Sequence, residues 1–242
     1  MDIYGLIGKN LSHSFSAEYF NTKFKANKIN ANYKLFPIDN IEKIIEIVSS
    51  NKNLKGLNIT IPYKESVIPF VNDIDKLGQE IGAINTIKIQ NNKLLGYNTD
   101  AIGFEKLLLS TKAFKSKKAL VLGYGGASKA VCYTLNELKI EYQKVSRTIH
   151  SDSILWEQIT REIIKKYEII INTTPLGMSP NTESFPLIPY DSICRNHLVI
   201  DLVYNPVRSI FLELAFKKGA KITNGLSMLY AQADAAWKIW NK

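Results

Sequence analysis

Apolar and polar residues follow two different periods along the first hundred positions. Alternating, β-branched runs typical of strands are separated by segments whose apolar side chains recur at helical spacing. We expect strands at residues 2–8, 32–38 and 55–62 and helices at 14–27 and 40–50. Two further short strands, 83–90 and 93–98, are joined by Asn91 and Asn92, which tolerate the positive φ of a tight turn. This order predicts an α/β unit with its own sheet.

The pattern restarts near Asp100 as a second alternation of helices and strands. Strands are expected at residues 117–123, 142–148, 168–174, 197–204 and 220–223, and helices at 101–110, 129–139, 155–166 and 209–218. Such an alternation predicts a doubly wound, Rossmann-like α/β sheet. The last stretch, 227–240, is an amphipathic helix with Trp237 and Trp240 near its end, and by its length we expect it to pack on the first unit. We therefore divide the chain into 1–99 plus 226–242, and 100–225.

Composition narrows the class of protein. With 242 residues and 45% hydrophobic content the chain can bury a sizeable core. It begins without a basic leader, and no apolar run approaches the roughly 20 residues that span a bilayer, so we expect a soluble, cytoplasmic protein. The two cysteines and three histidines share no metal-ligand spacing, which predicts neither a disulfide scaffold nor a metal site. The net charge of +9 is scattered, which favours small anionic ligands over nucleic acid.

A glycine-rich stretch, "ALVLGYGGAS", lies between an expected strand and an expected helix. Gly123 allows a tight turn there, and Gly125 allows the backbone to approach a pyrophosphate that sits on the helix N-terminus. Ser128 stands where a third glycine is common, and its small side chain still permits close packing. We therefore predict dinucleotide binding rather than a plain turn.

The end of the next predicted strand bears on the choice of dinucleotide. A site that prefers NAD carries an acid there, but this chain has Ser146, Arg147 and Thr148. A guanidinium offers a planar, charged fork to a 2′-phosphate. NADP is the favoured cofactor, although a surface arginine would fit the charge pattern equally well.

Polar side chains also gather around the expected strands of the first unit. They are Ser12, Ser14 and Ser16 after the first strand, Lys64 after the third, Asn85 on a later one, and Thr99 and Asp100 at the junction of the two halves. Ligands of open α/β sheets bind beyond the carboxyl ends of the strands, so these residues could converge on one crevice. Each also has an ordinary explanation, as a helix cap, a turn residue or a solvated lysine.

With these residues assembled, the chain resembles the shikimate dehydrogenase family from end to end. The resemblance is carried, in order, by "HSFS", "NITIPYK", "GAINT", "GYNTD", "GYGGASKA", "NTTPLGM", "DLVYNP" and "GLSMLYAQA". Two positions depart from the family pattern: Ser146 stands where asparagine is usual, and Ala17 where proline often follows the second serine. The chain also looks short for the family.

The resemblance implies reversible, NADPH-dependent reduction of 3-dehydroshikimate to shikimate, a step toward chorismate and the aromatic amino acids. It implies that 1–99 with 226–242 binds substrate and 100–225 binds NADP, and that Lys64 and Asp100 are the catalytic pair. The implied substrate-binding residues are Ser14, Ser16, Thr60, Asn85, Asp100, Tyr204 and Gln232. The implied cofactor-binding residues are Gly123, Gly125, Gly126, Ala127, Ser128, Ser146, Arg147, Thr148, Thr173, Gly225 and Met228.

Two other functions remain open at this point. One is a dehydrogenase of quinate or another cyclic hydroxy acid, and the other is a dinucleotide-binding module without turnover. The presence of both Lys64 and Asp100 speaks against the second, because a module without turnover has no evident need for that pair. We expect a monomer or a homodimer, with no membrane or nucleic-acid partner.

Overall fold

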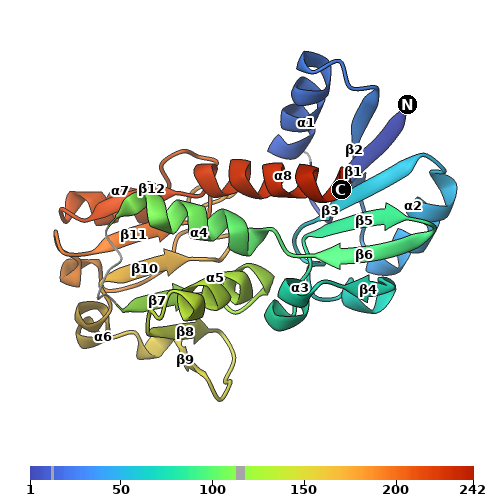
Figure 1. Ribbon diagram of the computed structural model, residues 1–242. Helices are drawn as coiled ribbons and strands as arrows, with labels where there is room; N and C mark the ends of the chain where they lie inside the picture. The colour runs from blue at the N-terminus through green and yellow to red at the C-terminus, as the bar shows by residue number, and fades with distance from the viewer. Residues whose placement is uncertain (12–13, 113–117) are drawn as a thin grey trace. The chain divides into compact units, whose positions relative to one another are not determined.

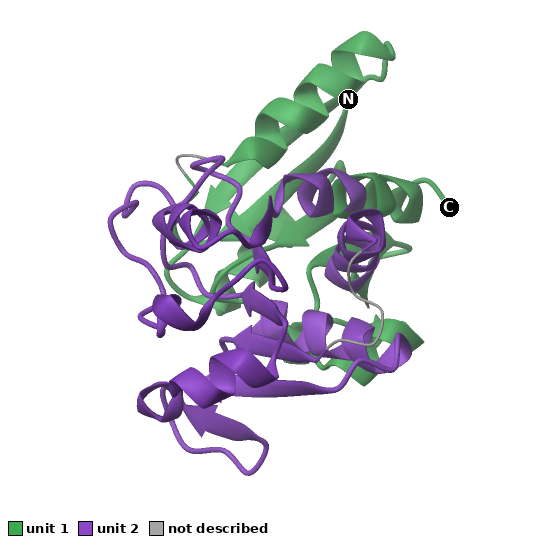
Figure 2. Cartoon of the chain, turned by 90° about the vertical axis from the view of Figure 1, so that its left-hand side faces the viewer, with its two compact units in different colours: residues 1–99, 232–242 green, residues 100–231 purple. Residues whose placement is uncertain are grey.

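The computed structural model describes residues 1–11, 14–112 and 118–242. Ser12, and His13 of the first family motif, therefore lie outside the described residues. The chain forms two compact units (Figure 2): unit 1 comprises Met1–Thr99 and Gln232–Lys242, and unit 2 comprises Asp100–Ala231. Across the described parts of the chain, no helix combines the length and the apolar character that crossing a membrane requires.

Unit 1 is built on a mixed sheet of six strands in the order β2-β1-β3-β5-β6-β4 (Figure 1). Its elements are β1 (Asp2–Gly8), α1 (Phe15–Ala26), β2 (Ala31–Pro37), α2 (Ile44–Ser50), β3 (Leu54–Ile59), β4 (Asp73–Ile74), α3 (Lys76–Ile81), β5 (Thr86–Gln90) and β6 (Lys93–Tyr97). β1, β2 and β3 run parallel, whereas β5 is antiparallel to both β3 and β6. The expected turn between β5 and β6 is confirmed, with φ of 52° at Asn91 and 59° at Asn92.

The short elements β4 and α3 were not expected from the sequence. A strand of two residues is too short to show a period. α3 begins where the Asp75 carboxylate accepts a hydrogen bond from the Gly78 N–H at 2.9 Å, and it ends at Gly82 with φ of 67°. Its bounds are therefore set by an N-cap and a left-handed C-cap rather than by an apolar repeat.

Both faces of the unit 1 sheet are covered. One face buries a cluster around Ile7, Leu57 and Ile87. The other buries aromatic side chains of β1, β2 and α1 together with Trp240 at the end of α8 (Leu226–Trp240). The Trp240 indole donates to the Ile87 carbonyl at 3.0 Å, so the last part of this helix packs on the first part of the chain, whereas its first residues, up to Ala231, belong to unit 2.

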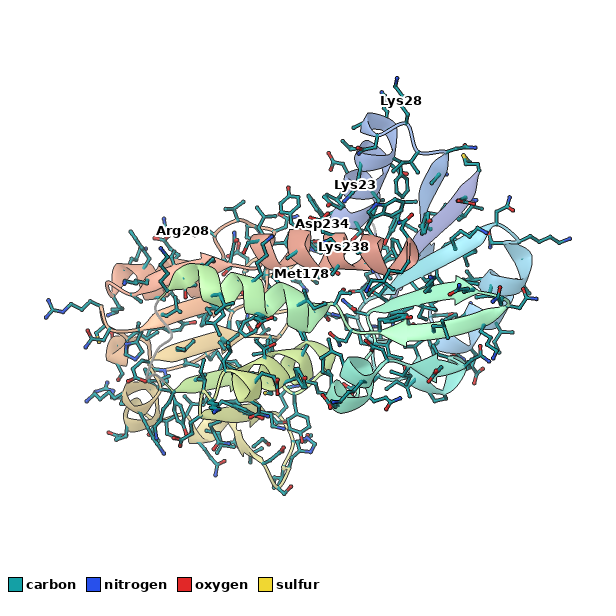
Figure 3. The ribbon with its side chains drawn as sticks, in the orientation of Figure 1. Lys23, Lys28, Met178, Arg208, Asp234 and Lys238 are labelled. Atoms are coloured by element: carbon teal, nitrogen blue, oxygen red, sulfur yellow. The ribbon has the colours of Figure 1, made fainter. Side chains whose placement is uncertain are left out.

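An ion pair adds to the contact between α1 and α8. Lys23 on α1 and Asp234 on α8 point toward each other (Figure 3), and their Nζ and Oδ1 atoms are 2.6 Å apart. The Tyr19 hydroxyl donates to the same carboxylate oxygen at 2.6 Å. These bonds hold the second half of α8 against α1.

Unit 2 is the expected doubly wound, Rossmann-like sheet. Its elements are α4 (Asp100–Thr111), β7 (Ala119–Leu122), α5 (Gly126–Glu137), β8 (Tyr142–Ser146), β9 (Ser153–Leu155), α6 (Arg161–Lys166), β10 (Ile169–Asn172), β11 (Leu198–Asp201), α7 (Ile210–Lys217), β12 (Lys221–Asn224) and the first part of α8. The strands are parallel in the order β9-β8-β7-β10-β11-β12, so the winding direction reverses between β7 and β10. Ligands of such sheets bind at this reversal, beyond the carboxyl ends of the strands.

The prediction of one helix in unit 2, at residues 155–166, is wrong. Residues 155–166 form the end of β9, a 3-10 turn at Trp156–Gln158 and only then α6. Thr160 is the N-cap of α6, because its hydroxyl accepts a hydrogen bond from the Ile163 N–H at 3.4 Å. Upstream of it, the backbone pairs with β8 as the edge strand of the sheet.

Candidate functional site

In unit 1, the polar residues singled out from the sequence meet at one edge of the sheet. β1 and β3 end there, and because β5 is antiparallel to β3, β5 begins there. Asn85 was expected within a strand at 83–90, but it directly precedes β5. β6 runs back to the same edge and ends at Tyr97, opposite Thr86, so Thr99 follows at that edge as well.

Lys64 lies in a turn that backbone hydrogen bonds hold on both sides. The Thr60 N–H donates to the Ile7 carbonyl and the Tyr63 N–H to the Thr60 carbonyl, each at 2.9 Å. The Lys64 carbonyl in turn accepts from the Ile84 N–H at 2.7 Å, next to Asn85. The lysine side chain itself is half-buried. It is thus fixed at its backbone, unlike a solvated lysine in an open loop.

Asn85, Thr99 and Gln232 form a polar group in which Asn85 and Thr99 are buried and Gln232 is half-buried, although Gln232 is far from the other two in the sequence. The Asn85 Oδ1 atom accepts a hydrogen bond from the Thr99 N–H at 2.7 Å. Its Nδ2 atom donates to Thr99 Oγ1 at 2.9 Å and to Gln232 Oε1 at 3.4 Å. The structure thus brings together two of the expected substrate-binding residues, Asn85 and Gln232.

The two serines lie at the start of α1. Within the described residues, the side chain of Ser14 makes no capping hydrogen bond although the residue occupies the N-cap position. Ser16 lies beside the phenol of Tyr33, whose pKa is held well above its usual range by burial and is lowered in part by the Ser16 hydroxyl. The N-terminus of this 12-residue helix is an environment that favours an anion.

Asp100 is the first residue of unit 2 and of α4, and its side chain is only 5% exposed. A carboxylate in the first turn of a helix is stabilised by the helix dipole. Asp100 follows Thr99 directly in the chain, so its backbone position is tied to the Asn85–Thr99 hydrogen bonds of unit 1.

The glycine loop of unit 2 has the geometry that its sequence predicts. Gly123 directly follows β7 and has a φ of 126°, in the region that favours glycine. Gly125 is the N-cap of α5, and no atom of the described residues lies within 4 Å of the place a Cβ would take. The Ser128 hydroxyl donates to the Gly123 carbonyl at 2.9 Å and closes the loop on α5. Gly126 and Ala127 follow as the first residues of the helix.

Thr173 stands directly beside this loop, at the end of β10. Its hydroxyl donates to the Leu122 carbonyl at 2.8 Å, and a Cβ on Gly123 would overlap its Oγ1 atom. The glycine loop and Thr173 therefore border the point at which the strand order reverses. A pyrophosphate fits there, because Gly125 leaves the space open and α5 presents its N-terminal N–H groups.

At the end of β8, Ser146 is buried whereas Arg147 and Thr148 are exposed. The Ser146 hydroxyl accepts from the Thr148 N–H at 3.1 Å and so shapes the turn that carries the arginine. Thr148 Oγ1 lies 2.9 Å from His150 Nε2. An exposed guanidinium on a shaped turn is available to a 2′-phosphate.

The sequence analysis missed an aromatic cluster next to this turn. The ring of Tyr124, from the glycine loop, stacks on His150 with centroids 3.8 Å apart. Its hydroxyl donates to Asp152 at 2.9 Å, Lys144 pairs with the same carboxylate, and the Lys144 Nζ atom lies 4.5 Å from the centre of the Tyr124 ring. These contacts tie the loop after β8 to the glycine loop. No spacing in the sequence signals them, since they depend on the neighbouring positions of β7 and β8.

The remaining expected site residues lie after β11 and at the start of α8. Tyr204 is half-buried in the loop that follows β11. Gly225 is packed so closely on Leu202 that a Cβ would overlap its carbonyl. Met228 is 8% exposed and packs in the apolar core between the sheet and α4 and α5. Its cofactor role stays a prediction.

A second polar network, also missed, fixes the loop after β10. The carboxylate of Asp201 is fully buried and accepts hydrogen bonds from Ser209 Oγ, from Asn172 Nδ2 at 2.9 Å and from the Val203 N–H at 3.0 Å. Asn172 Oδ1 in turn accepts from the hydroxyl of Thr174 at 2.6 Å. Burial raises the pKa of Asp201 to about 6, although its three donors act in the opposite direction.

The comparisons with known proteins agree on one family. The family model of the shikimate dehydrogenase substrate binding domain matches residues 6–87. A shikimate dehydrogenase (NADP(+)) of Methanococcus maripaludis is 39% identical over 258 residues, covering 98% of this chain and 90% of the relative. The crystal structure of shikimate dehydrogenase 1 from Peptoclostridium difficile superposes with a TM-score of 0.90 at 35% identity, covering 100% of this chain and 92% of that one.

A further solved structure carries ligands. The shikimate 5-dehydrogenase of Thermus thermophilus, in complex with NADP(H) and shikimate, has a TM-score of 0.88 at 27% identity and covers 99% of this chain and 93% of that one. The fold and the two polar groups thus define an α/β protein with one unit of dinucleotide-binding topology. The chain belongs to the shikimate dehydrogenase family.

Proposed function

We propose that this protein catalyses the reversible, NADPH-dependent reduction of 3-dehydroshikimate to shikimate. The observation that carries the proposal is the Asn85–Thr99–Gln232 group at the strand ends of unit 1, in a chain that is related over nearly its full length to NADP-dependent shikimate dehydrogenases. Quinate dehydrogenation and binding without turnover are not favoured. The protein acts in the cytoplasm as a monomer or a homodimer, which sedimentation would distinguish.

NADPH supplies the hydride in this reaction. Gly125 and the N-terminus of α5 hold its pyrophosphate, with Gly123, Ser128 and Thr173 fixing the loop around it. Arg147 pairs with the 2′-phosphate as a charged, planar donor. Gly225 and Met228 would lie near the nicotinamide end of the bound cofactor.

The substrate is held by its charged and hydroxyl groups. Ser14 and Ser16, at the N-terminus of α1, bind the carboxylate, where hydroxyl donors and the helix dipole favour an anion. The ring hydroxyls bind the other polar residues of the site, which are Thr60, Asn85, Asp100 and Gln232, and Tyr204 would sit near the substrate. These contacts place the ketone carbon for transfer and lower the entropy cost of the step.

Lys64 is the proton donor during reduction and the acceptor during oxidation. Negative charge develops on the ketone oxygen as the carbon is reduced, and a donor aimed at that oxygen stabilises it. The half-buried Lys64 has a backbone fixed by the Thr60 turn and by Ile84, which fixes the point from which its side chain extends. Asp100 orients a substrate hydroxyl and attracts the ammonium group as the second member of the pair.

The first test is the loss of reduced-nicotinamide absorbance when the purified protein meets 3-dehydroshikimate, with NADPH and NADH in parallel. We expect fast turnover with NADPH and slow turnover with NADH. Comparable rates with NADPH and NADH would support the proposed reaction but contradict the pairing of Arg147 with the 2′-phosphate. A folded protein that binds NADPH but consumes none would contradict the proposed function.

The second test removes the proton donor. Lys64→Ala should lower kcat by a factor of about 10²–10⁴, because general acid catalysis is lost while binding of NADPH is kept. Lys55→Ala, an exposed lysine on β3 that no step of the mechanism uses, is the matched control and should keep the parent rate. A kcat of Lys64→Ala within a few-fold of the parent would rule out the assigned role.

A further inference from the structure

Three buried polar side chains lead from β2 to the Asn85–Thr99–Gln232 group. They are Tyr33 on β2, Asn58 on β3 and Thr86 on β5, which are 3%, 6% and 0% exposed. The Tyr33 hydroxyl lies 2.8 Å from Asn58 Oδ1, and Asn58 Nδ2 lies 3.1 Å from Thr86 Oγ1. None of the three belongs to the residues assigned above to substrate, cofactor or proton transfer.

The direction of the first hydrogen bonds follows from a backbone group. Asn58 Nδ2 lies 3.3 Å from the Asn85 carbonyl, which can only accept, so this side of the Asn58 amide is its nitrogen. The other side is Oδ1, and Tyr33 must therefore donate its single proton to it. Thr86 Oγ1 accepts from Asn58 and passes its own proton to Asn85 Oδ1 at 3.2 Å.

A second backbone group sets the direction at the other end. The Thr99 N–H can only donate, so the atom of Asn85 that receives it is Oδ1, and Nδ2 faces Thr99 Oγ1 and Gln232. Gln232 consequently presents its oxygen to Asn85, since two amide nitrogens facing each other would repel. The NH₂ group of Gln232 is then directed to the side away from Asn85.

We propose that Tyr33, Asn58 and Thr86 are positioning residues for the substrate half of the site. Acting through Asn85, they hold Gln232 in the orientation in which it offers a hydrogen-bond donor to a hydroxyl or carbonyl oxygen of the substrate. The proposal rests on the function proposed above, because it concerns how that substrate is held. It adds that the affinity for substrate depends on side chains that do not touch it.

Buried hydrogen bonds that share partners reinforce one another, and double-mutant cycles measure this coupling. Tyr33 and Thr86 both bond to Asn58, so removing one alters the bond that the other makes. Loss of either removes a hydrogen bond of the buried Asn58 amide, and the hydrogen bond that Thr86 donates to Asn85 Oδ1 is weakened or lost with it. Independent structural roles would produce no such dependence.

The test uses variants that keep shape and remove one hydroxyl. Thr86→Val and Tyr33→Phe should each raise the KM for 3-dehydroshikimate about tenfold, with the KM for NADPH unchanged, because only the substrate half of the site is affected. Thr86→Ser restores the hydroxyl and should return the KM for 3-dehydroshikimate to within about twofold of the parent. In Thr86→Val/Tyr33→Phe the two effects should be far from multiplicative.

Tyr190→Phe is the matched control. Tyr190 is a half-buried tyrosine of unit 2 whose hydroxyl donates to the Pro186 carbonyl at 2.6 Å, so its loss costs a comparable hydrogen bond outside the polar chain. It should lower the unfolding midpoint without changing the KM for 3-dehydroshikimate. The proposal is overturned if Thr86→Val and Tyr33→Phe behave like this control, or if Thr86→Ser does not restore the KM for 3-dehydroshikimate.

Denaturant unfolding of four proteins, the parent, Thr86→Val, Tyr33→Phe and the double variant, measures the coupling between these hydrogen bonds without any substrate. Coupled losses of unfolding free energy are expected, and additive losses would overturn the proposal. If the unfolding cycle shows coupling but the parent protein turns over no 3-dehydroshikimate, the proposed function is contradicted, whereas the coupling of Tyr33, Asn58 and Thr86 is supported. The two failures are therefore distinguishable.

Discussion

Gly125→Ala separates the requirements of cofactor binding from those of folding. Gly125 is the N-cap of α5, with φ of −85°, an angle that alanine adopts readily. Among the described residues, no atom lies within 4 Å of the Cβ that the substitution adds. The added methyl group therefore meets no atom of the described protein, and it fills the space through which a pyrophosphate approaches the helix N-terminus.

The expected effect on stability is small. Alanine is a poorer N-cap than glycine, but it also restricts the unfolded chain, which offsets about 0.4–1 kcal/mol. The free energy of unfolding should therefore change by less than about 1 kcal/mol. The dissociation constant for NADPH should rise at least about tenfold, because the phosphate is displaced from the N–H groups that hold it.

Gly123→Ala is the contrasting variant in the same loop. Its φ of 126° is unfavourable for alanine, and the new Cβ overlaps Thr173 Oγ1, which donates to the Leu122 carbonyl. Backbone strain of about 1–3 kcal/mol and a disturbed hydrogen bond of about 0.5–1.5 kcal/mol give a loss of about 1.5–4.5 kcal/mol. In this variant we expect a loss of unfolding free energy to be the main effect, rather than a loss of affinity for NADPH.

Denaturant unfolding and fluorescence titration with NADPH measure the two quantities separately. A Gly125→Ala protein that binds NADPH with the parent affinity would refute the placement of the pyrophosphate at this glycine. A loss of 2 kcal/mol or more in the same variant would refute the open space that the structure shows there.

Three further predictions concern charge and packing. Arg147→Leu should weaken the binding of NADPH about 10- to 100-fold in direct titration and leave the binding of NADH nearly unchanged, since only the 2′-phosphate needs the guanidinium. Equal losses of affinity for both dinucleotides would contradict the assignment of Arg147 to the 2′-phosphate. Burial raises the pKa of Asp201 to about 6, so the folded state binds this proton more tightly than the unfolded chain does. Protonation of Asp201 therefore adds to the free energy of unfolding below about pH 4, and this stabilisation is lost as the pH rises through 6. Asp201→Asn should remove this slope, worth up to about 3 kcal/mol, from unfolding free energies measured between pH 4 and 7; an unchanged slope would contradict it. Gly56→Ala should destabilise the protein by about 2–4 kcal/mol in denaturant unfolding, because its Cβ overlaps the indole of Trp240; a near-neutral change would count against that packing.

Local patterns predict most of the fold, because each depends on residues close in the chain. The alternation of strands and helices indicated both sheets, and the glycine loop indicated the turn between β7 and α5. The pattern failed at 155–166, where apolar residues that suit a helix also suit an edge strand beside β8. The choice there was made by strand pairing and by the cap at Thr160, neither of which a short apolar run reveals.

The site shows the same division between local and distant information. Lys64 and the glycine loop were found because their motifs are contiguous in the sequence. Asn85 was expected within a strand but precedes β5, whose start at this edge is set by its antiparallel pairing with β3. The contacts of Tyr124 with His150 were missed because they join two separate loops.

The sequence by itself determined the two α/β units, the dinucleotide loop and the family, since periodicity, turn residues and motifs are properties of short stretches. Only the tertiary structure decided that Asn85 and Gln232 share a hydrogen bond across 147 positions of sequence, and that Tyr33, Asn58 and Thr86 lead to them. Hydrogen-bond direction depends on which donor meets which acceptor, and that is settled by strand order and register.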